Sequence, residues 1–433
     1  MTSIESLHEP VKVAFITYEY PPDTAFGGIA TYVHQAARML HSRGHHVEVF
    51  AGSQDRSKTT RADGFLVHRV QELDLRNFYL PIGKVFAERH AAVQFDVLEG
   101  PEYAADAREA VRLVPEIPLV IKLHTPTRLL FELNCNPPPA LSLKAKVSGY
   151  LGSLVRGARP GWGRDLGFER YRAQTKAADD VERSHALDAD EIASPSKELG
   201  EIVADIWGLN PDMVAHVPYP YRAPEKLLRI PVETHTNVVT FMGRLEVRKG
   251  VLQLAEAIPK VLDRFPEARF RFVGSSDDSP DPGVSMVEFL SRKLRNYRRA
   301  VKFTGGVPME TIPEILATTD VCVFPSLWEN FPLVCLESMA AARGIVASNA
   351  GGMKDMLNDG EAGLLIPPGS ADAITEALID LLNHPEARMQ LGELARRRLL
   401  NEYNVDCIGA LQEASYIRAK ARRLARGSRA STC

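Results

Sequence analysis

The stretch Ser326-Leu-Trp-Glu-Asn-Phe-Pro-Leu-Val-Cys-Leu-Glu-Ser-Met-Ala340 determines how the whole chain is interpreted. It follows Val321-Cys-Val-Phe324, a short apolar run rich in β-formers that predicts a buried strand. Pro332 suits the first position of a following helix, where its missing N–H is not needed, and this places Asn330 or Glu329 near the N-cap. The helix then has an apolar stripe made of Leu333, Val334, Leu336, Met339 and Ala340. We therefore predict a strand–loop–helix unit.

The start of such a helix is a predicted anion site. Its first N–H groups have no partner within the helix and carry about half a positive charge, and phosphate is the usual occupant. Glu329 in the loop and Glu337 in the helix flank this point. Each could accept hydrogen bonds from hydroxyl groups, one set on each side of the anion. A sugar and a ribose joined by a diphosphate present hydroxyl groups in that arrangement. The alternative is an ordinary crossover with two solvated glutamates.

Composition limits the class of protein. A chain of 433 residues is long for one core, so we expect two domains. With 45% hydrophobic residues, 25% charged residues and a net charge of −3, it is typical of a soluble globular protein and gives no sign of nucleic-acid binding. Five cysteines without a Cys-x-x-Cys pair favour reduced thiols. No signal sequence and no apolar run near about 18 residues is evident, so we expect a cytoplasmic location.

The first half alternates strands and helices, which predicts a parallel, doubly wound α/β sheet. The predicted strands are 11–17, 47–50, 65–70, 95–98, 119–123 and 191–193, and the predicted helices are 28–42, 102–113 and 196–207. The pattern is interrupted near 125–190 by a mostly helical insertion. From Arg128 to Lys176 it carries nine Lys/Arg against three Asp/Glu. It is either a solvated insertion or a face for an anionic acceptor or a membrane surface.

A second sheet of the same kind follows a proline-rich linker near Val217–Pro231. Its predicted strands are 238–241, 269–273, 301–303, 321–324, 345–347 and 363–366, and its helices are 250–264, 284–298, 308–317, 332–343 and 370–383. The segment 385–426 is predicted to be helical. From Glu413 to residue 433 the chain has six Lys/Arg and no further acid, which indicates a solvated tail or a weakly membrane-seeking one.

Two cations follow the first strand of the second half. Arg244 comes at the strand's carboxyl end, where open α/β sheets bind their ligands. Lys249 lies at the start of the next helix, so both cations are expected to reach one anion; the alternative is a pair of surface charges. A departing diphosphate needs two such charges.

Weaker signals lie elsewhere. Gly27 and Gly28 at the first strand-to-helix turn would let a ligand approach the backbone, although a tight turn is the alternative, and they form neither a dinucleotide fingerprint nor a P-loop. His124 ends a predicted strand and is either structural or part of the site. The acidic run Asp277–Asp281 is interpreted as a flexible polar loop and not as a metal site.

Together these motifs resemble the retaining family-4 glycosyltransferases with the GT-B fold. The resemblance rests on Gly27-Gly28, His124, Gly243-Arg244 with Lys249-Gly250, and Glu329 separated by seven residues from Glu337, and it runs from residue 11 to about 400. It implies two Rossmann-like domains facing each other across a cleft. The implied parts are an acceptor domain at 1–217, a linker at 218–236, a donor domain at 237–400, and a C-terminal helix with a basic tail at 401–433 that packs back on the first domain.

The resemblance also implies roles. Arg244 and Lys249 would neutralise the pyrophosphate, Glu329 would hold donor-sugar hydroxyls, and His124 would contact the donor sugar. The other implied donor contacts are Gly27 and Gly28, Val307 beside the base, the backbone of Asn330, Phe331, Pro332 and Leu333, and Glu337 on the ribose. Asn330 departs from the family at a position where glycine is common, and Tyr219-Pro220-Tyr221 replaces the usual Asn-Gly turn near the linker.

The implied activity is transfer of a sugar from a UDP- or GDP-sugar to a hydroxyl acceptor by front-face displacement, with the configuration retained. No metal or other cofactor and no side-chain general base is expected. The acceptor is a glycan, a small molecule or a lipid-linked sugar, with peripheral membrane contact through the basic segments as one option. The alternatives are a nucleotide-sugar epimerase or phosphorylase of the same fold, and a non-catalytic two-domain binding protein.

Overall fold

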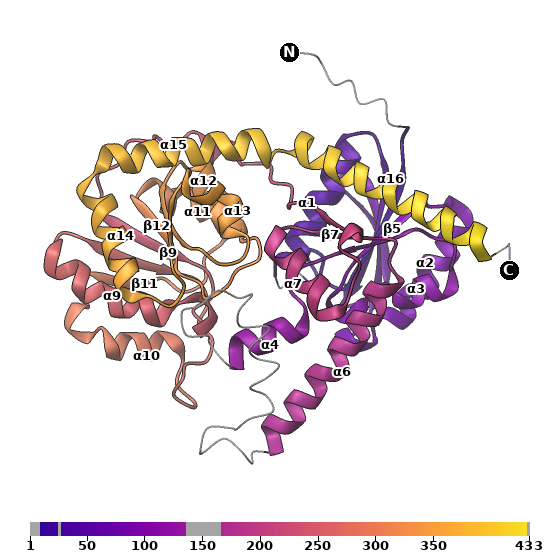
Figure 1. Cartoon of the computed structure of the whole chain (residues 1–433), viewed down its shortest axis with the longest axis horizontal. Helices are drawn as coiled ribbons and strands as arrows, with labels where there is room; N and C mark the ends of the chain where they lie inside the picture. Colours follow the sequence, from indigo (N-terminus) through magenta and orange to yellow (C-terminus); the bar gives the residue numbers. More distant parts are fainter. Residues whose placement is uncertain (1–8, 25–26, 136–165, 431–433) are drawn as a thin grey trace.

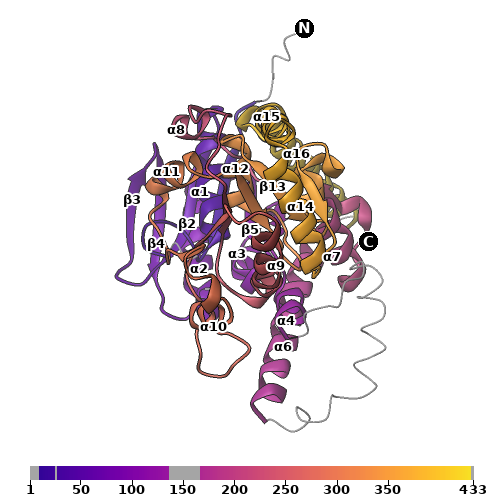
Figure 2. The ribbon, with the colours of Figure 1, turned by 90° about the vertical axis from the view of Figure 1, so that its left-hand side faces the viewer.

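The computed structural model describes residues 9–24, 27–135 and 166–430, so the central part of the predicted insertion, 136–165, lies outside the described residues. Two lobes are visible, each built around a sheet (Figure 1). Helices α4 (Thr127–Cys135) and α6 (Leu166–Asp188) flank the gap and lie side by side in both views (Figures 1 and 2).

The N-terminal lobe contains an eight-stranded sheet in the order β3-β4-β2-β1-β5-β6-β7-β8. Its strands are β1 (Lys12–Thr17), β2 (His46–Ser53), β3 (Lys58–Ala62), β4 (Phe65–Gln71), β5 (Val97–Pro101), β6 (Leu119–Lys122), β7 (Glu191–Ser194) and β8 (Val214–His216). All neighbours are parallel except β3 and β4. The sequence did not predict β3, because this edge strand is polar and largely exposed and so lacks an apolar pattern.

The side chains of alternate β1 residues are buried on opposite faces of this sheet. Val13 and Phe15 pack in one core cluster with α1 (Gly28–Ser42) and α16 (Val405–Ala430), whereas Ala14 and Ile16 pack in another. The second cluster contains side chains of α2 (Tyr79–Val93), α3 (Arg108–Leu113) and α7 (Lys197–Trp207). Helices therefore cover both faces, as a mostly parallel sheet requires.

The predicted helix 102–113 is wrong at its start. After β5 the chain makes a tight turn in which Ala104 has φ 59° and Ala105 has φ 50°, and α3 begins only at Arg108. A left-handed backbone cannot continue an α-helix. Glu102 in this turn is fully buried and accepts the N–H of His124 at 2.8 Å. The turn is thus tied to the carboxyl end of β6.

The C-terminal lobe contains a six-stranded parallel sheet in the order β11-β10-β9-β12-β13-β14. Its strands are β9 (Val238–Met242), β10 (Arg269–Val273), β11 (Val301–Phe303), β12 (Val321–Phe324), β13 (Gly344–Ser348) and β14 (Leu364–Ile366). Three helices, α9 (Val251–Arg264), α10 (Met286–Lys293) and α14 (Ala371–Asn383), share one core cluster with this sheet. Side chains of α11 (Ile312–Ala317), α12 (Leu333–Ala340) and α15 (Pro385–Glu402) belong to another.

The C-terminal helices connect the lobes: α15 lies along the C-terminal lobe, and α16 runs across the N-terminal one (Figure 1). The basic tail, expected to be solvated or weakly membrane-seeking, pairs with acids of the N-terminal lobe over the residues described there. Arg418 and Arg422 bind the buried Glu191, and Arg423 binds the buried Asp190. Lys420 binds Asp96, and Arg426 donates to two carbonyls. These cations hold α16 on the sheet.

Two further expectations concern environment. Cys322 and Cys335 are buried free thiols, and Cys407 is an exposed one. Among the described residues, no helix has both the length and the apolar character needed to cross a bilayer.

Candidate active site

The candidate site lies where two neighbouring C-lobe strands end. Strand β9 leads into Gly243 and Arg244, and β12 leads into the loop before α12, so both loops leave the same edge of the sheet. Gly250 brings them together: its φ is 71°, and a Cβ on it would lie 1.9 Å from the carbonyl oxygen of Pro325. Only glycine permits that approach, which sets Lys249 against the loop 326–332.

Lys249 and Glu329 form an ion pair at the centre of the site. The Lys249 ammonium donates to Glu329 Oε2, and Ser326 Oγ lies 3.3 Å from the same oxygen. Burial alone would raise the pKa of Glu329, but Lys249 and Arg248 outweigh it and leave that pKa below its ordinary value. Burial also lowers the pKa of Lys249, an effect that Glu329 partly offsets. Glu329 is therefore the ionised carboxylate of this pair.

Arg248 also belongs to this cluster, although no role was predicted for it. Its guanidinium lies 3.6 Å from Glu329 Oε1 and 2.7 Å from Glu246 Oε1. Arg244 lies 3.4 Å from the same Glu246 atom and 3.6 Å from Asp277, with 57% of its side chain exposed. Cations and carboxylates thus alternate from Arg244 to Lys249. Arg244 is linked to Glu329 through Glu246 and Arg248 and has no direct contact with it among the described residues.

The loop before α12 differs from the prediction in which residue is the N-cap of the helix. Pro332 is the N-cap and Leu333 the first helical residue, so neither Asn330 nor Glu329 caps the helix. The reason is that Pro332 has an extended ψ of 122°. Asn330 instead bridges the lobes: its Nδ2 donates to the carbonyl of His124, and its Oδ1 accepts from Ser196 Oγ at 3.0 Å.

Phe331 is also bound within the protein. Its ring lies between Tyr219 and Tyr403, with both centroids 5.5 Å away. The side chains of Asn330 and Phe331 thus have partners inside the fold. What this segment leaves for a ligand is its backbone and the first N–H groups of α12.

Glu337 is a half-buried carboxyl on α12 with no hydrogen bond or ion pair to any residue that the structure describes. Burial raises its pKa to about 7. A desolvated carboxyl without a partner is unfavourable for folding alone, so such groups are candidates for ligand contacts.

His124 follows β6 and is 8% exposed. Its Nδ1 lies 2.7 Å from Tyr219 Oη, while its buried Nε2 has no hydrogen-bond partner within the described residues. Burial, aided by Lys122, lowers the pKa of His124 to about 3, so the ring is neutral. Tyr219, in the proline-rich linker, therefore fixes the orientation of this ring.

Three more predicted positions lie at the ends of strands or helices. Gly27 is the N-cap of α1, and both Gly27 and Gly28 are exposed. Val307 lies in the loop after β11, half-buried against the core. The acidic loop contributes Asp277 to Arg244, and no group of His, Cys, Asp or Glu in the described ranges is arranged to hold a metal ion.

Comparison with known families accounts for both halves of the chain. Residues 27–220 match the model "Glycosyl transferase 4-like domain", and residues 226–398 match "Glycosyl transferases group 1". The chain belongs to the group 1 glycosyltransferases. This glycosyltransferase is 25% identical over 414 residues to an uncharacterized glycosyltransferase, MJ1607, of Methanocaldococcus jannaschii, covering 92% of this chain and 96% of that protein.

Solved structures share the fold of this glycosyltransferase. Sucrose-phosphate synthase from Thermosynechococcus elongatus superposes with a TM-score of 0.70 at 20% identity, covering 95% of this chain and 99% of that one. HepE of Anabaena, solved with UDP and glucose, gives 0.65 at 16% identity, covering 94% and 99%. The expected GT-B architecture of two Rossmann-like sheets is confirmed.

The N-terminal lobe of this glycosyltransferase contributes Glu19, which the sequence reading missed. Burial raises the pKa of Glu19, an effect opposed by the nearby N–H groups of Ala30 and Gly27 and by Arg244 of the other lobe. A Cβ on Gly27 would lie 3.5 Å from Glu19 Oε2. The start of α1 and Arg244 therefore approach one carboxyl from opposite lobes.

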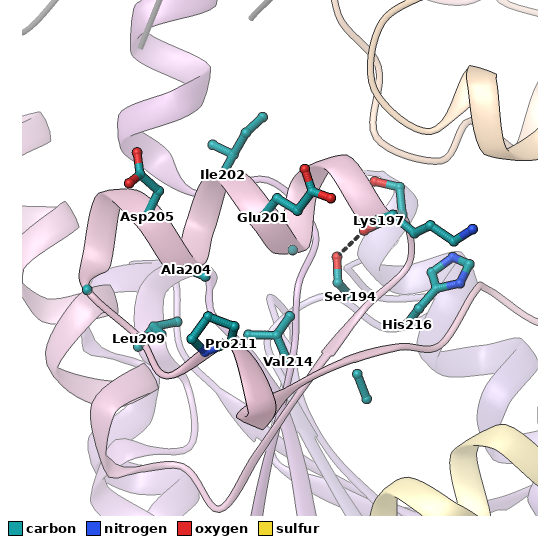
Figure 3. A pocket seen from close by; sticks show the side chains of 14 residues that line it. Ser194, Lys197, Glu201, Ile202, Ala204, Asp205, Leu209, Pro211, Val214 and His216 are labelled. Atoms are coloured by element: carbon teal, nitrogen blue, oxygen red, sulfur yellow. Dashed lines mark hydrogen bonds between the residues drawn. The ribbon is translucent and has the colours of Figure 1, made fainter. Parts of the chain in front are cut away.

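A cavity of about 820 Å³ lies between α7 and the edge strand β8 (Figure 3). Its lining includes Lys197, Asp205, Leu209, Val214 and His216. None of the predicted site residues lines it. The cavity is therefore separate from the candidate site at the strand ends around Glu329.

Proposed function

We propose that this chain is a retaining glycosyltransferase that uses a nucleoside diphosphate sugar, UDP- or GDP-linked, and a hydroxyl acceptor. The observation that carries the proposal is the buried Lys249–Glu329 pair beside the N-terminus of α12. Together the two loops combine a positive charge, the first N–H groups of a helix and a carboxylate at one place. A sugar diphosphate needs those three partners.

Each group receives a role in this proposal. Lys249, Arg244 and the first N–H groups of α12 would hold the diphosphate, with Gly27 and Gly28 closing from the other lobe. Glu329 would accept hydrogen bonds from donor-sugar hydroxyls, and Glu337 from the ribose. Val307 would lie beside the base. The neutral His124 would offer Nε2 to the donor sugar. The structure of HepE with UDP and glucose supports this ligand class.

The proposed chemistry is a front-face displacement. The bond between the anomeric carbon and the β-phosphate oxygen breaks, and the acceptor oxygen forms its bond on the same face. The acceptor's proton passes to the departing β-phosphate. Lys249, Arg244 and the helix N-terminus stabilise the negative charge that develops there, and such preorganised charges are commonly the largest catalytic term. No side-chain base is needed in this scheme.

A thermal-shift panel of UDP-glucose, GDP-mannose and ADP-glucose tests the ligand class. A sugar nucleotide at about 100 times its Kd should stabilise the protein by about 2.7 kcal/mol. The sugar nucleotide that binds is then incubated alone and with glycan and lipid-linked acceptors. Release of nucleoside diphosphate shows transfer. Retention is supported if the anomeric linkage of the product has the same configuration as that of the donor, assigned by NMR of the anomeric proton. Isomerised donor indicates an epimerase, and binding without turnover indicates a binding protein.

Donor binding should depend on pH through Glu337. Because burial raises its pKa to about 7, this carboxyl is only partly ionised at neutral pH. The ionised form accepts hydroxyl hydrogen bonds better, so affinity for UDP-glucose should rise by about tenfold from pH 6 to pH 8 if binding requires it. UDP-glucose is the appropriate probe because its diphosphate, esterified at both ends, has no proton that titrates near neutrality. Calorimetry with Glu337→Gln should show a flat profile, and an unchanged slope in that variant would refute the role.

A further inference from the structure

We propose that Glu198, on α7 of the N-terminal lobe, is a positioning residue for Glu329 of the C-terminal lobe. Its Oε1 accepts the indole N–H of Trp328 at 3.2 Å, and its Oε2 accepts the N–H of Gly351 at 3.0 Å. The Glu198 carboxylate thus binds Trp328, the residue before Glu329, and Gly351, which forms a β-bridge with Glu329. The inference rests on the proposed donor-binding role of Glu329.

The backbone around Glu329 explains why these two contacts matter. Glu329 forms an isolated parallel bridge with Gly351, and the N–H of Gly352 donates to the Glu329 carbonyl at 2.9 Å. Successive side chains of an extended segment point to opposite sides. Trp328 and Asn330 accordingly face the N-terminal lobe, while Glu329 faces Lys249.

The segment on the other side of this bridge is tightly packed. A Cβ on Gly351 would lie 1.9 Å from the Glu329 carbonyl oxygen, and one on Gly352 would lie 1.8 Å from that of Asn330. Any shift of Gly351 therefore moves the backbone of Glu329 directly. Since Glu198 binds the Gly351 N–H, it controls the position of both strands of the bridge.

The first turn of α7 forms a docking point between the lobes. Ser196 binds Asn330, and the N–H of Lys197 donates to Asp355 Oδ2 at 2.8 Å. Figure 3 shows Lys197 at this end of the helix and Asp205 at the other, beside the cavity. Contacts between the lobes thus hold the loop that carries Glu329, and Glu198 makes two of them, to Trp328 and to Gly351.

The side-chain chemistry fits a positioning role. Glu198 carries two acceptor oxygens and uses one for each N–H. Burial raises its pKa, an effect opposed by the Gly351 N–H and by the Trp328 indole. A glutamine at this position would keep one acceptor and turn an amide N–H toward the other donor, so it would retain only one contact.

The test compares Glu198→Ala and Glu198→Gln with Asp205→Asn, an exposed carboxylate on the same helix that lines the cavity. The first readout is hydrogen exchange of the free protein over 326–332 and 350–353. The second is kcat for cleavage of UDP-glucose, GDP-mannose or ADP-glucose, whichever is turned over, together with the Kd of the matching nucleoside diphosphate. These readouts separate positioning of Glu329 from loss of folding or of diphosphate binding.

We expect Glu198→Ala to speed exchange at Gly351 and to lower kcat by roughly 10- to 100-fold, because small misplacements of a substrate contact have effects of that size. The Kd of the diphosphate should change less than about twofold, since Glu198 does not touch it. Glu198→Gln should fall between the wild type and Glu198→Ala, and Asp205→Asn should match the wild type.

Unchanged exchange over both segments in Glu198→Ala overturns the proposal, and so does an unchanged kcat. If the wild type cleaves a donor and Glu329→Ala does not, while Glu198→Ala equals the wild type, only the positioning role fails. If the wild type neither binds nor cleaves any sugar nucleotide, the proposed function fails, and the exchange measurement still decides whether Glu198 holds the loop.

Discussion

Replacing Lys249 with alanine should lower kcat for donor cleavage by about 100- to 1000-fold, the usual effect of removing one preorganised charge from a transition state. Lys249 is the cation that contacts Glu329 directly, and only 15% of its side chain is exposed. Water therefore cannot replace it well. The variant would also leave Glu329 with Arg248 at 3.6 Å as its nearest cation. The loss should appear mainly in kcat, measured from nucleoside diphosphate release.

Two controls sharpen this experiment. Lys260→Ala removes a half-exposed lysine of α9 that binds Asp372, and it should leave the rate unchanged. Lys249→Arg keeps the charge but not the compact shape, so it should recover part of the rate. A Lys249→Ala enzyme with wild-type kcat would mean that the diphosphate is stabilised elsewhere.

Replacing Glu413 with alanine should destabilise the N-terminal lobe by about 3–5 kcal/mol, the typical result of breaking a buried charge pair. Glu413 is 4% exposed and accepts Arg43 Nε at 2.7 Å and His45 Nε2 at 2.9 Å. Its loss leaves the largely buried guanidinium of Arg43 with the exposed Asp406 as its remaining carboxylate partner. The corresponding drop in Tm is roughly 6 to 20 °C for a lobe of this size.

A surface carboxylate of the preceding helix is the matched control. Glu402 binds Arg398 at 2.6 Å, but 51% of its side chain is exposed. Glu402→Ala should therefore change stability by no more than about 1 kcal/mol. Equal melting temperatures for Glu413→Ala and the wild type would show that α16 is held mainly by its apolar face.

Much of the fold followed from the sequence because its central strands are short apolar runs separated by Gly and Pro. The strand 321–324 and the helix after Pro332 are examples, and the structure moves the helix start by only one residue. Edge elements were harder. Strand β3 is polar, and β8 (Val214–His216) is only partly buried at the point where the linker was expected to begin. Neither has the periodic apolar pattern on which the prediction depends.

Some residues of the candidate site could likewise be predicted from the sequence, and others could not. Arg244, Lys249 and Glu329 follow strands that could be recognised, and carboxyl ends of parallel strands lie at one edge of a sheet. Arg248 was missed because adjacent basic residues in a loop do not reveal which one is buried. Glu198 and Gly351 are 153 residues apart, and their contact depends on how the lobes pack. No local pattern contains that information.

The basic C-terminal segment shows a further limit. Six unopposed cations after Glu413 gave no sign of their partners, because Asp96, Asp190 and Glu191 come from much earlier in the chain. Each acid immediately precedes or begins a strand of the N-terminal sheet. A long helix crossing that sheet meets them together, although they are far apart in sequence.

The most direct test of the central claim is a crystal structure of the protein with the nucleoside diphosphate that the thermal-shift panel identifies. We predict a β-phosphate within hydrogen-bond distance of Lys249 Nζ and of the first N–H groups of α12, with ribose hydroxyls on Glu337. A nucleotide bound elsewhere, for example in the cavity between α7 and β8, with Lys249 still bound only to Glu329, would contradict the account.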